Sequence, residues 1–533
     1  MTRTPLSLFD TTLRDGQQTQ GVQFSTPEKH RIAKALDALG LDYIEGGWPG
    51  ANPTDSAFFD EAPKTRATFT AFGMTKRAGI SAENDDVLAA VMNANTPAVC
   101  LVGKTHDFHV KTALGISNAE NVENIGKSFD HLIANQRETL FDAEHFFDGF
   151  KANPDYALEC IHAAFDAGVR WVVLCDTNGG TLPAEIGAIT AKVIASGIPG
   201  DRLGIHTHDD TGNAVAGSLA AVDAGARQIQ GTLNGLGERC GNANLTTLIP
   251  TLLLKEPYAS AYDIGVSRDN LVSLTRASRM LDEILNRVPL RAAPYVGASA
   301  FAHKAGLHAS AILKDPTTYE HIDPTVVGNQ RIIPMSNQAG QSNLRTRLSD
   351  MGLKVAKGDA ALGRILERIK TREDAGYSYD TAQASFELIA RDELGQLPRF
   401  FEVERYRVSI ERVGKITVSE AVVAVVIDGE RFLSVSESRD EDGSDQGPVN
   451  ALSRALAKDL GRYQAAIDDM HLMDFKVRIT QGGTEAVTRV IIDSQDGQGR
   501  RWSTVGVSPN IVDASFEALL DAIRWKLVRD ASG

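Results

Sequence analysis

Eight short runs of apolar or β-branched residues alternate with segments of helical period over the first 255 residues. The expected strands cover residues 6–12, 42–48, 66–72, 98–102, 138–144, 170–176, 203–208 and 228–234. The expected helices include residues 27–39, 82–93, 121–134, 155–167, 183–195 and 213–224. Several of these helices open with Ser, Asn or Pro and are followed by Gly, as helix ends favour. Eight such units predict an α/β chain with a (β/α)8 TIM barrel, and a doubly wound parallel sheet is the alternative.

Polar residues stand at the carboxyl ends of the expected strands, where a TIM barrel places its active site. His206 and His208 end the seventh strand, and side chains at positions i and i+2 of a strand share one side. Asp15 closes a Thr-Thr-Leu-Arg-Asp run after the first strand, and Glu144 ends the fifth. Together the two motifs predict a metal site, whereas an isolated His-x-His is more often a surface or core pair without metal.

The chain changes character after residue 254 and predicts two further parts. Residues 262–288 have a helical pattern, a loop-rich link follows, and residues 343–391 are helical and charged. Strand patterns at 401–411, 415–428 and 431–437 precede a helix at 449–460, and patterns at 471–480, 485–493 and 502–507 precede a helix at 511–528. This repeat of about 70 residues indicates a small α+β domain. We expect a catalytic barrel at 1–270, helical linker subdomains at 271–399 and a C-terminal regulatory domain at 400–533.

Charge and cysteine content argue against several classes of function. The net charge is −14 and no long Lys/Arg run occurs, so a nucleic-acid partner is not expected. Four cysteines lie far apart without a Cys-x-x-Cys pair, which predicts reduced thiols and no thiolate zinc site. No run approaches the roughly 18 apolar residues of a membrane span, and the N-terminus lacks a signal-like stretch. We expect a cytoplasmic protein without a membrane partner.

Three motifs, in this order, resemble one metal-dependent barrel superfamily. They are Asp-Thr-Thr-Leu-Arg-Asp-Gly-Gln-Gln at residues 10–18, His-Thr-His at 206–208 and Asn-Gly-Leu-Gly-Glu-Arg-Cys-Gly-Asn at 234–242. The superfamily holds 2-isopropylmalate synthase, homocitrate synthase, citramalate synthase and the hydroxymethylglutaryl-CoA lyases. Residues 43–55 and 143–149 resemble the citramalate synthases most closely. The likeness spans the whole chain, and the C-terminal repeat resembles the feedback domain of the family.

The resemblance implies that Asp15, His206, His208 and Asn242 bind a divalent cation. Two imidazoles, a carboxylate and an amide oxygen suit Mg²⁺, Mn²⁺ or Zn²⁺, and they leave an octahedral ion two open positions. A 2-oxo acid can fill both positions, and the ion then polarises its keto group. Arg14 is implied to bind this substrate and to stabilise negative oxygen in the transition state, the alternative being a structural ion pair at the barrel mouth.

The same resemblance places other residues around the substrates. Thr177 is implied to donate its hydroxyl to the carboxylate of the oxo acid and Gln18 to line that pocket, although both could be strand-end capping groups. Glu144, His308 and Tyr319 are candidates for the base that takes a methyl proton from acetyl-CoA. In the family the last two come from the linker subdomain and reach into the barrel of a partner chain, which implies a homodimer. The alternatives are a solvated carboxylate for Glu144 and a packing or hydrogen-bonding role for His308.

Glycines of the third motif are implied to contact the co-substrate. Gly235 and Gly237 would let the backbone approach the CoA portion of acetyl-CoA closely. A glycine-rich turn alone is weak evidence of ligand binding.

Pyruvate is the expected oxo acid. The strand segment 139–144 supplies no cation for a second carboxylate, and a buried unpaired carboxylate is costly. Leu101, Leu140, Phe141 and Met74 are expected to narrow the pocket. The resemblance therefore implies condensation of acetyl-CoA with pyruvate and water to (R)-citramalate and CoA for isoleucine synthesis, with isoleucine as effector at the C-terminal repeat. The alternatives are 2-isopropylmalate synthesis from 2-oxoisovalerate, a metal-dependent aldol-type lyase, and an inactive barrel whose repeat binds amino acids.

Overall fold

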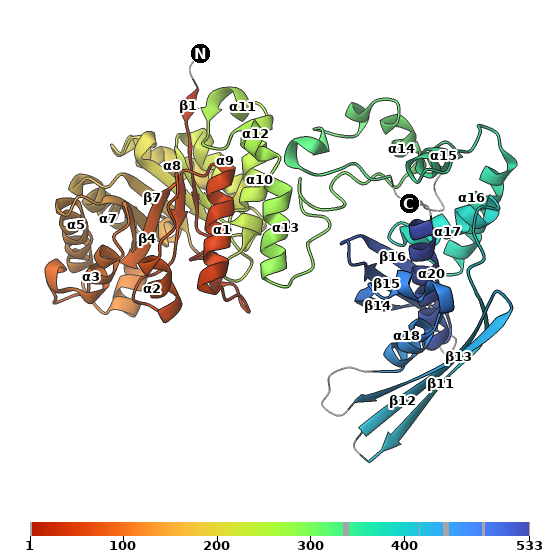
Figure 1. Cartoon of the computed structure of the whole chain (residues 1–533). Coiled ribbons are helices and arrows are strands. Elements are labelled where there is room, and N and C mark those ends of the chain that lie inside the picture. Colours follow the sequence, from red (N-terminus) through yellow and green to blue (C-terminus); the bar gives the residue numbers. More distant parts are fainter. Residues whose placement is uncertain (1–2, 334–340, 415, 441–446, 482–485, 532–533) are drawn as a thin grey trace. The chain divides into compact units, whose positions relative to one another are not determined.

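The computed structural model of the chain describes residues 3–333, 341–414, 416–440, 447–481 and 486–531 (Figure 1). The chain divides into two compact units. The first unit comprises Met1–Phe301 and Ile322–Arg331, and the second comprises Ala302–His321 and Ile332–Gly533. The domain boundaries expected after residues 270 and 399 stay predictions.

Eight parallel strands close into a barrel in the first unit. They are β2 (Ser7–Asp10), β3 (Tyr43–Glu45), β4 (Thr68–Met74), β5 (Ala98–Lys104), β6 (Glu138–Glu144), β7 (Trp171–Asp176), β8 (Leu203–Thr207) and β9 (Gln228–Gly231). Each strand pairs in parallel with the next, and β9 pairs with β2 to complete the ring. The predicted (β/α)8 barrel is therefore confirmed. The alternative of a doubly wound sheet is wrong, because such a sheet keeps two open edges.

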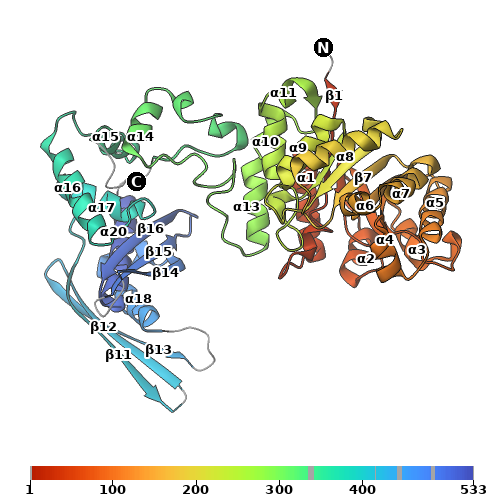
Figure 2. The same ribbon diagram turned by 180° about the vertical axis from the view of Figure 1, so that it is seen from behind.

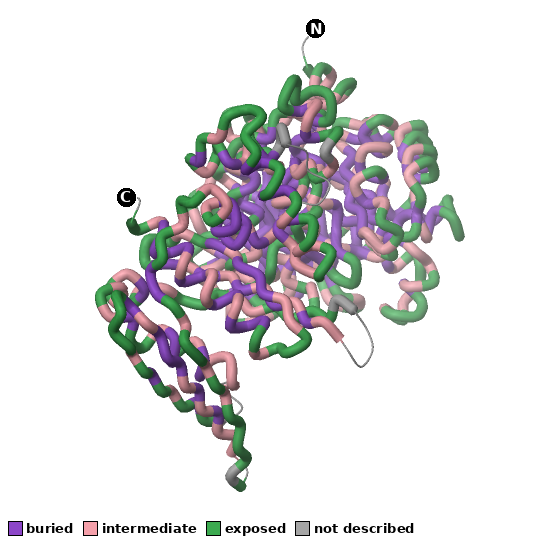
Figure 3. Tube along the Cα trace, turned by 90° about the vertical axis from the view of Figure 1, so that its right-hand side faces the viewer, coloured by how far each residue is buried: buried purple, intermediate pink, exposed green. Residues whose placement is uncertain are grey.

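Helices follow the strands and surround the barrel (Figure 2). The main ones are α1 (Thr26–Leu39), α2 (Pro53–Asp60), α3 (Asp86–Asn93), α5 (Asn118–Ala134), α7 (Pro154–Ala167), α8 (Pro183–Ala195), α9 (Ala214–Ala224) and α10 (Leu245–Leu254). Local signals set their ends. Ser25 and Glu28 form a capping box at the start of α1, and Gly40 ends that helix in a left-handed conformation with φ 98°. Apolar residues between the strands and the helices form the main core, which Figure 3 shows as buried positions.

A separate apolar cluster fills the inside of the barrel, and it corrects one expectation. Leu140 belongs to this inner cluster, together with Phe72 and the adjoining Val102. Leu101 and Phe141 instead lie in the outer core between strands and helices. Successive residues of a strand face opposite sides. Leu101 and Phe141 therefore point away from the interior, and the expectation that they narrow a substrate pocket is wrong.

The segment after the barrel is only partly helical. β10 (Tyr262–Asp263) pairs in parallel with β1 (Thr4–Pro5), and α12 (Arg268–Leu271) and α13 (Leu274–Ile284) follow it. The helical expectation for residues 262–288 is therefore wrong at its start, because this short strand pairs with the N-terminal strand. Asn234 holds α13 against the loop after β9 through its Nδ2, which donates to the carbonyl oxygen of Ser278 at 3.0 Å.

The second unit consists of helices followed by two similar α+β modules. The helices include α14 (Gly306–Ile312), α15 (Gln341–Asp350), α16 (Ala360–Asp374) and α17 (Gln383–Glu393). In the first module, the antiparallel strands β11 (Glu402–Val413), β12 (Ile416–Ile427) and β13 (Glu430–Asp440) precede α18 (Pro448–Lys458). In the second module, β14 (His471–Gln481), β15 (Val487–Gln495) and β16 (Arg501–Ser508) precede α20 (Ile511–Ala531).

Both modules contribute to one apolar cluster, which confirms the expected α+β domain with an internal repeat. Lys415 and Glu485, the first residues of two expected strands, lie outside the described residues. Across the described ranges, every helix is too short or too polar to cross a membrane.

Candidate metal centre and active site

The loop after β2, the end of β8 and the loop after β9 bring four polar side chains together. They are Asp15, His206, His208 and Asn242, the four predicted ligands, and all of them are buried. The ligand atoms of the first three lie within 4.8 Å of one another. The backbone of His208 bridges to Asn242, and the Asn242 side chain interacts with Asp15. The fold therefore gathers these residues at the carboxyl end of the barrel.

The donor atoms of this cluster fit a divalent cation. His206 Nε2 lies 3.3 Å from His208 Nε2 and 3.4 Å from Asp15 Oδ2. Asp15 Oδ1 and Asn242 Oδ1 are buried and accept no hydrogen bond from a described residue. Asn242 Nδ2 donates to the carbonyl oxygen of Leu236 at 3.1 Å, so its Oδ1 is the atom left for a ligand. Ligands on neighbouring corners of an octahedron around a small divalent ion lie about 3 Å apart, which these spacings match.

Burial and charge hold these groups in the protonation states that metal binding requires. Burial lowers the pKa of His206 to about 3 and also lowers that of His208. Burial by itself raises the pKa of Asp15, but its charged and hydrogen-bonding neighbours, with the Arg14 guanidinium first, lower it more, so the net shift is downward. At neutral pH the imidazoles are therefore neutral and the carboxylate is ionised, as in a metal ligand set.

Short polar side chains build the turn that carries Arg14 and Asp15. Asp10 at the end of β2 accepts hydrogen bonds from the backbone N–H of Thr12 at 2.9 Å and from its hydroxyl at 2.8 Å. The N–H of Asp15 donates to the carbonyl oxygen of Thr11 at 2.9 Å. Burial raises the pKa of Asp10 to about 7. The chain therefore leaves the strand in a tight turn that places Arg14 and Asp15 directly above β2.

Arg14 lies within a buried acidic cluster that the sequence did not reveal. Its Nε is 2.7 Å from Glu45 Oε2, and its Nη1 is 3.1 Å from Asp15 Oδ2. Its Nη2 is 3.7 Å from Asp142 Oδ2, and its guanidinium lies 3.9 Å over the ring of Phe72. Burial, and then the charge of Glu45, raise the pKa of Asp142 to about 7. Glu45 ends β3 and Asp142 stands near the end of β6, so their places at strand ends were the signal that could have selected them.

Glu144 at the end of β6 has an unexpected partner. Lys104 ends the neighbouring β5 in register with it, and the Lys104 Nζ lies 2.5 Å from Glu144 Oε2. Both side chains are 24% exposed, so they face the mouth of the barrel. Thr177 Oγ accepts the backbone N–H of His145 at 2.8 Å, which leaves the Thr177 hydroxyl hydrogen to donate elsewhere. Gln18, at the end of the short helix η1 (Gly16–Gln18), is exposed.

Gly235 and Gly237 shape the loop that carries Asn242. A Cβ at Gly237 would lie 2.2 Å from Asn242 Nδ2, so only glycine leaves room for that amide. Gly235 has φ +68°, a left-handed conformation that favours glycine, and its carbonyl oxygen accepts the N–H of Asn242 at 3.1 Å. Both glycines therefore act on the candidate metal ligand, and their contact with CoA stays a prediction.

His308 and Tyr319 lie together in the second unit. His308 is on α14, and Tyr319 follows the short helix η6 (Pro316–Thr318). Their rings stack with centroids 4.0 Å apart and planes at 28°. Tyr319 is 45% exposed, and His308 is exposed as well. The structure brings these two candidate bases together on a surface, and their approach to a barrel stays a prediction.

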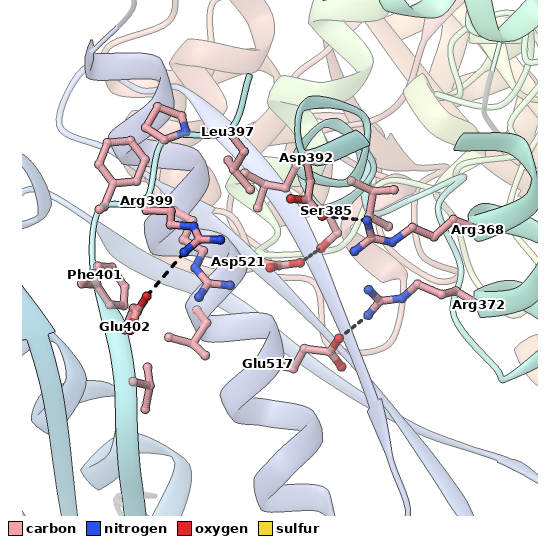
Figure 4. Close-up of a pocket in the computed structure, with 17 residues that line it drawn as sticks. Arg368, Arg372, Ser385, Asp392, Leu397, Arg399, Phe401, Glu402, Glu517 and Asp521 are labelled. Atoms are coloured by element: carbon pink, nitrogen blue, oxygen red, sulfur yellow. Dashed lines mark hydrogen bonds and ion pairs between the residues drawn. The ribbon is translucent and has the colours of Figure 1, made fainter. Parts of the chain in front are cut away.

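A cavity of about 560 Å³ lies in the second unit, between α16, α17, the start of β11 and α20 (Figure 4). Arg372 pairs with Glu517 across it, and Asp521 accepts a hydrogen bond from the hydroxyl of Ser385 at 2.7 Å. Burial raises the pKa of Asp521 to about 6. The side chains of Arg372, Glu517 and Asp521 thus have partners within the protein. The ligand cluster of the barrel differs, because Asp15 Oδ1 and Asn242 Oδ1 have no hydrogen-bond partner among the described residues.

Three family models match the sequence, one for each part of the chain. The model described as HMGL-like matches residues 5–277. A homocitrate synthase post-HMGL domain-like model matches residues 295–377, and a LeuA allosteric (dimerisation) domain matches residues 380–527. The chain belongs to the HMGL-like family.

Relatives align with this HMGL-like family member along nearly its full length. The (R)-citramalate synthase of Synechocystis sp. is 45% identical, over 98% of this chain and 96% of the relative. The (R)-citramalate synthase of Aquifex aeolicus is 46% identical over 98% of each chain. A probable 2-isopropylmalate synthase of Methanopyrus kandleri is 32% identical over 97% of each chain. The likeness is thus greater to these citramalate synthases than to this isopropylmalate synthase.

Proposed function

We propose that the protein is an (R)-citramalate synthase, an acyltransferase that condenses acetyl-CoA with pyruvate and water to give (R)-citramalate and CoA. The observation that carries the proposal is the buried cluster of Asp15, His206, His208 and Asn242 beside Arg14. The 45% identity to a citramalate synthase over almost the whole chain supports this activity over 2-isopropylmalate synthesis. The product would feed isoleucine biosynthesis.

The four clustered residues would hold Mg²⁺, Mn²⁺ or Zn²⁺, which supplies Lewis acidity at the keto oxygen of pyruvate. Arg14 binds that oxygen as it gains negative charge, because Glu45 and Asp15 hold its guanidinium at 2.7 and 3.1 Å. Thr177 donates its hydroxyl hydrogen to the carboxylate of pyruvate, since its oxygen already accepts the N–H of His145. Gln18 lines the same pocket from the rim.

Glu144 is the proposed base that removes a methyl proton from acetyl-CoA. Lys104, 2.5 Å away, holds the carboxylate in place at the barrel mouth. The resulting enolate carbon bonds to the keto carbon of pyruvate, and the keto oxygen takes up a proton to become a hydroxyl. Water then adds its oxygen to the thioester carbonyl carbon, which becomes a carboxylate as CoA leaves as the thiol. His308 and Tyr319 complete this site from the linker subdomain of a second copy, which makes the working form a homodimer. Gly235 and Gly237 lie along the path of the CoA chain.

A panel of 2-oxo acids with acetyl-CoA, followed by the release of free thiol, tests this function. We expect release with pyruvate that is abolished by a chelator and restored by a divalent cation. Release with 2-oxoisovalerate but not with pyruvate would reassign the protein to isopropylmalate synthesis. Cleavage of a hydroxy acid or an acyl-CoA to carbonyl products without thiol release would show a lyase instead.

The C-terminal repeat is proposed to bind isoleucine as a feedback inhibitor. Support comes from the match of residues 380–527 to a domain described as allosteric. We expect isoleucine to inhibit the full chain and to have no effect on a chain that ends near Leu397. Equal inhibition of both forms would contradict this role of the repeat. The cytoplasmic location stays a prediction.

A further inference from the structure

We propose that Gln230 and Asp142 form a positioning relay that fixes the tautomer of His206 and so sets the cation affinity of the candidate metal centre. The relay rests on the metal site proposed above. Gln230 Oε1 lies 3.0 Å from His206 Nδ1, and Gln230 Nε2 donates to Asp142 Oδ1 at 2.9 Å. All three side chains are buried, with exposed fractions of 0% for Gln230, 4% for Asp142 and 5% for His206.

The tautomer of His206 decides whether it can bind a cation. A neutral imidazole carries one proton and coordinates only through the nitrogen that lacks it. His206 Nε2 faces His208 and Asp15, so this is the nitrogen that must be unprotonated. The proton then lies on Nδ1, and a hydrogen-bond acceptor beside Nδ1 favours that form. Gln230 Oε1 is such an acceptor.

Gln230 alone cannot make this choice, because its carboxamide can turn either its oxygen or its nitrogen toward His206. Asp142 settles the orientation. Its carboxylate oxygen accepts hydrogen bonds, so the amide turns Nε2 toward Asp142 and leaves Oε1 for the imidazole. The reverse orientation would set two acceptors face to face in a buried site.

The barrel itself builds this relay. Gln230 on β9 stands in parallel register with His206 on β8, so neighbouring strands present the two side chains to each other. Asp142 comes from β6 on another side of the barrel wall and also faces Arg14 Nη2 at 3.7 Å through its second oxygen. The relay therefore links the proposed cation ligand to the arginine that would contact the substrate.

Titration of the metal-free full-length protein with Mn²⁺, read by electron paramagnetic resonance at pH 8, tests the relay without relying on turnover. We expect Gln230→Leu to weaken Mn²⁺ binding by about 10- to 100-fold, the usual effect of removing a partner that orients a metal ligand. Gln228→Leu is the matched control. Gln228 is buried on the same face of β9, and neither polar side-chain atom has a hydrogen-bond partner among the described residues. We expect it to bind Mn²⁺ as the wild type does.

A second pair of variants keeps the test decisive if Gln230→Leu fails to fold. Asp142→Asn lets the Gln230 amide turn either way, so Mn²⁺ binding should weaken although residue 142 is two contacts from the ion. Adding Gln230→Glu to Asp142→Asn should restore affinity, because a carboxylate at 230 can only accept from His206 and from the new amide. Wild-type affinity in Asp142→Asn, or no recovery in the double variant, would overturn the relay. Failure of the wild type to bind Mn²⁺ would instead overturn the metal centre itself.

Discussion

Removal of the buried ammonium of Lys29 should destabilise the barrel far more than a surface change does. Lys29 on α1 is fully buried, and its Nζ donates to the carbonyl oxygens of Leu13 at 2.9 Å and Gly46 at 3.0 Å and pairs with Asp55. Leu13 precedes Arg14, so this lysine also anchors the turn of the candidate site. Loss of one partner of a buried ion pair leaves an uncompensated charge and costs about 3–5 kcal/mol. Lys29→Met keeps the aliphatic stem without the ammonium, and we expect a loss in that range.

Scanning calorimetry measures this effect. A loss of this size should lower the unfolding temperature of the barrel by roughly 5–8 °C. Lys34→Met, on an exposed position of the same helix, is the matched control and should shift it by about 1 °C or less. Asp55→Asn added to Lys29→Met should recover part of the loss, because it removes the stranded charge and keeps an acceptor for the N–H of Trp48. A Lys29→Met protein that unfolds at the wild-type temperature would refute the reasoning.

Three further predictions concern the cavity, the thiols and the glycine loop. Burial raises the pKa of Asp521 from 3.8 to about 6, so the stability of the native state falls as pH rises through that interval. The variant Asp521→Asn should therefore be more stable than the wild type by up to about 3 kcal/mol at pH 8 and equally stable near pH 3. Thermal unfolding at the two pH values measures this difference. Cys240 is the exposed cysteine, so a thiol reagent should modify one thiol per native chain and all four after denaturation. Gly237→Ala should displace Asn242 and weaken Mn²⁺ binding at least tenfold, whereas Gly363→Ala, with nothing within 4 Å of its Cβ, should not.

The order and type of the elements could be predicted because each leaves a local signal. The helix expected at residues 183–195 agrees with α8 (Pro183–Ala195), since Pro fits the first turn of a helix and an apolar face runs along it. The strand expected to reach residue 12 ends at Asp10, because the Asp10 carboxylate binds the N–H and hydroxyl of Thr12 and turns the chain. A contact between a side chain and a residue two positions further on, such as that of Asp10 with Thr12, is thus what hydrophobic periodicity misses.

The sequence could not predict which side chains of each barrel strand face the interior and which face the helices. Parallel strands that are buried on both sides carry apolar residues at successive positions, so periodicity does not distinguish the interior from the outer face. This is why Leu101 was expected in the pocket while Val102 faces the interior. Gln230 could not be selected for the same reason, since a single polar residue within a buried strand has no partner in sequence. The candidate metal ligands could be predicted from the sequence only because they stand in motifs at strand ends.

The charge balance inside the barrel mouth explains why the cluster suits a cation. Asp15, Glu45 and Asp142 all approach Arg14, and buried carboxylates in excess of their counter-charges are costly. Asp142 relieves part of this excess by taking up a proton below about pH 7, whereas at pH 8 it is ionised and accepts from Gln230. Asp15 stays ionised because its pKa is lowered. The neutral imidazoles of His206 and His208 do not offset its negative charge. Its negative charge stays at the centre of the cluster, and an incoming oxo acid would add another. If the function proposed above holds, we therefore expect the substrate anion to bind only together with a cation at Asp15, so that the two binding events would be cooperative.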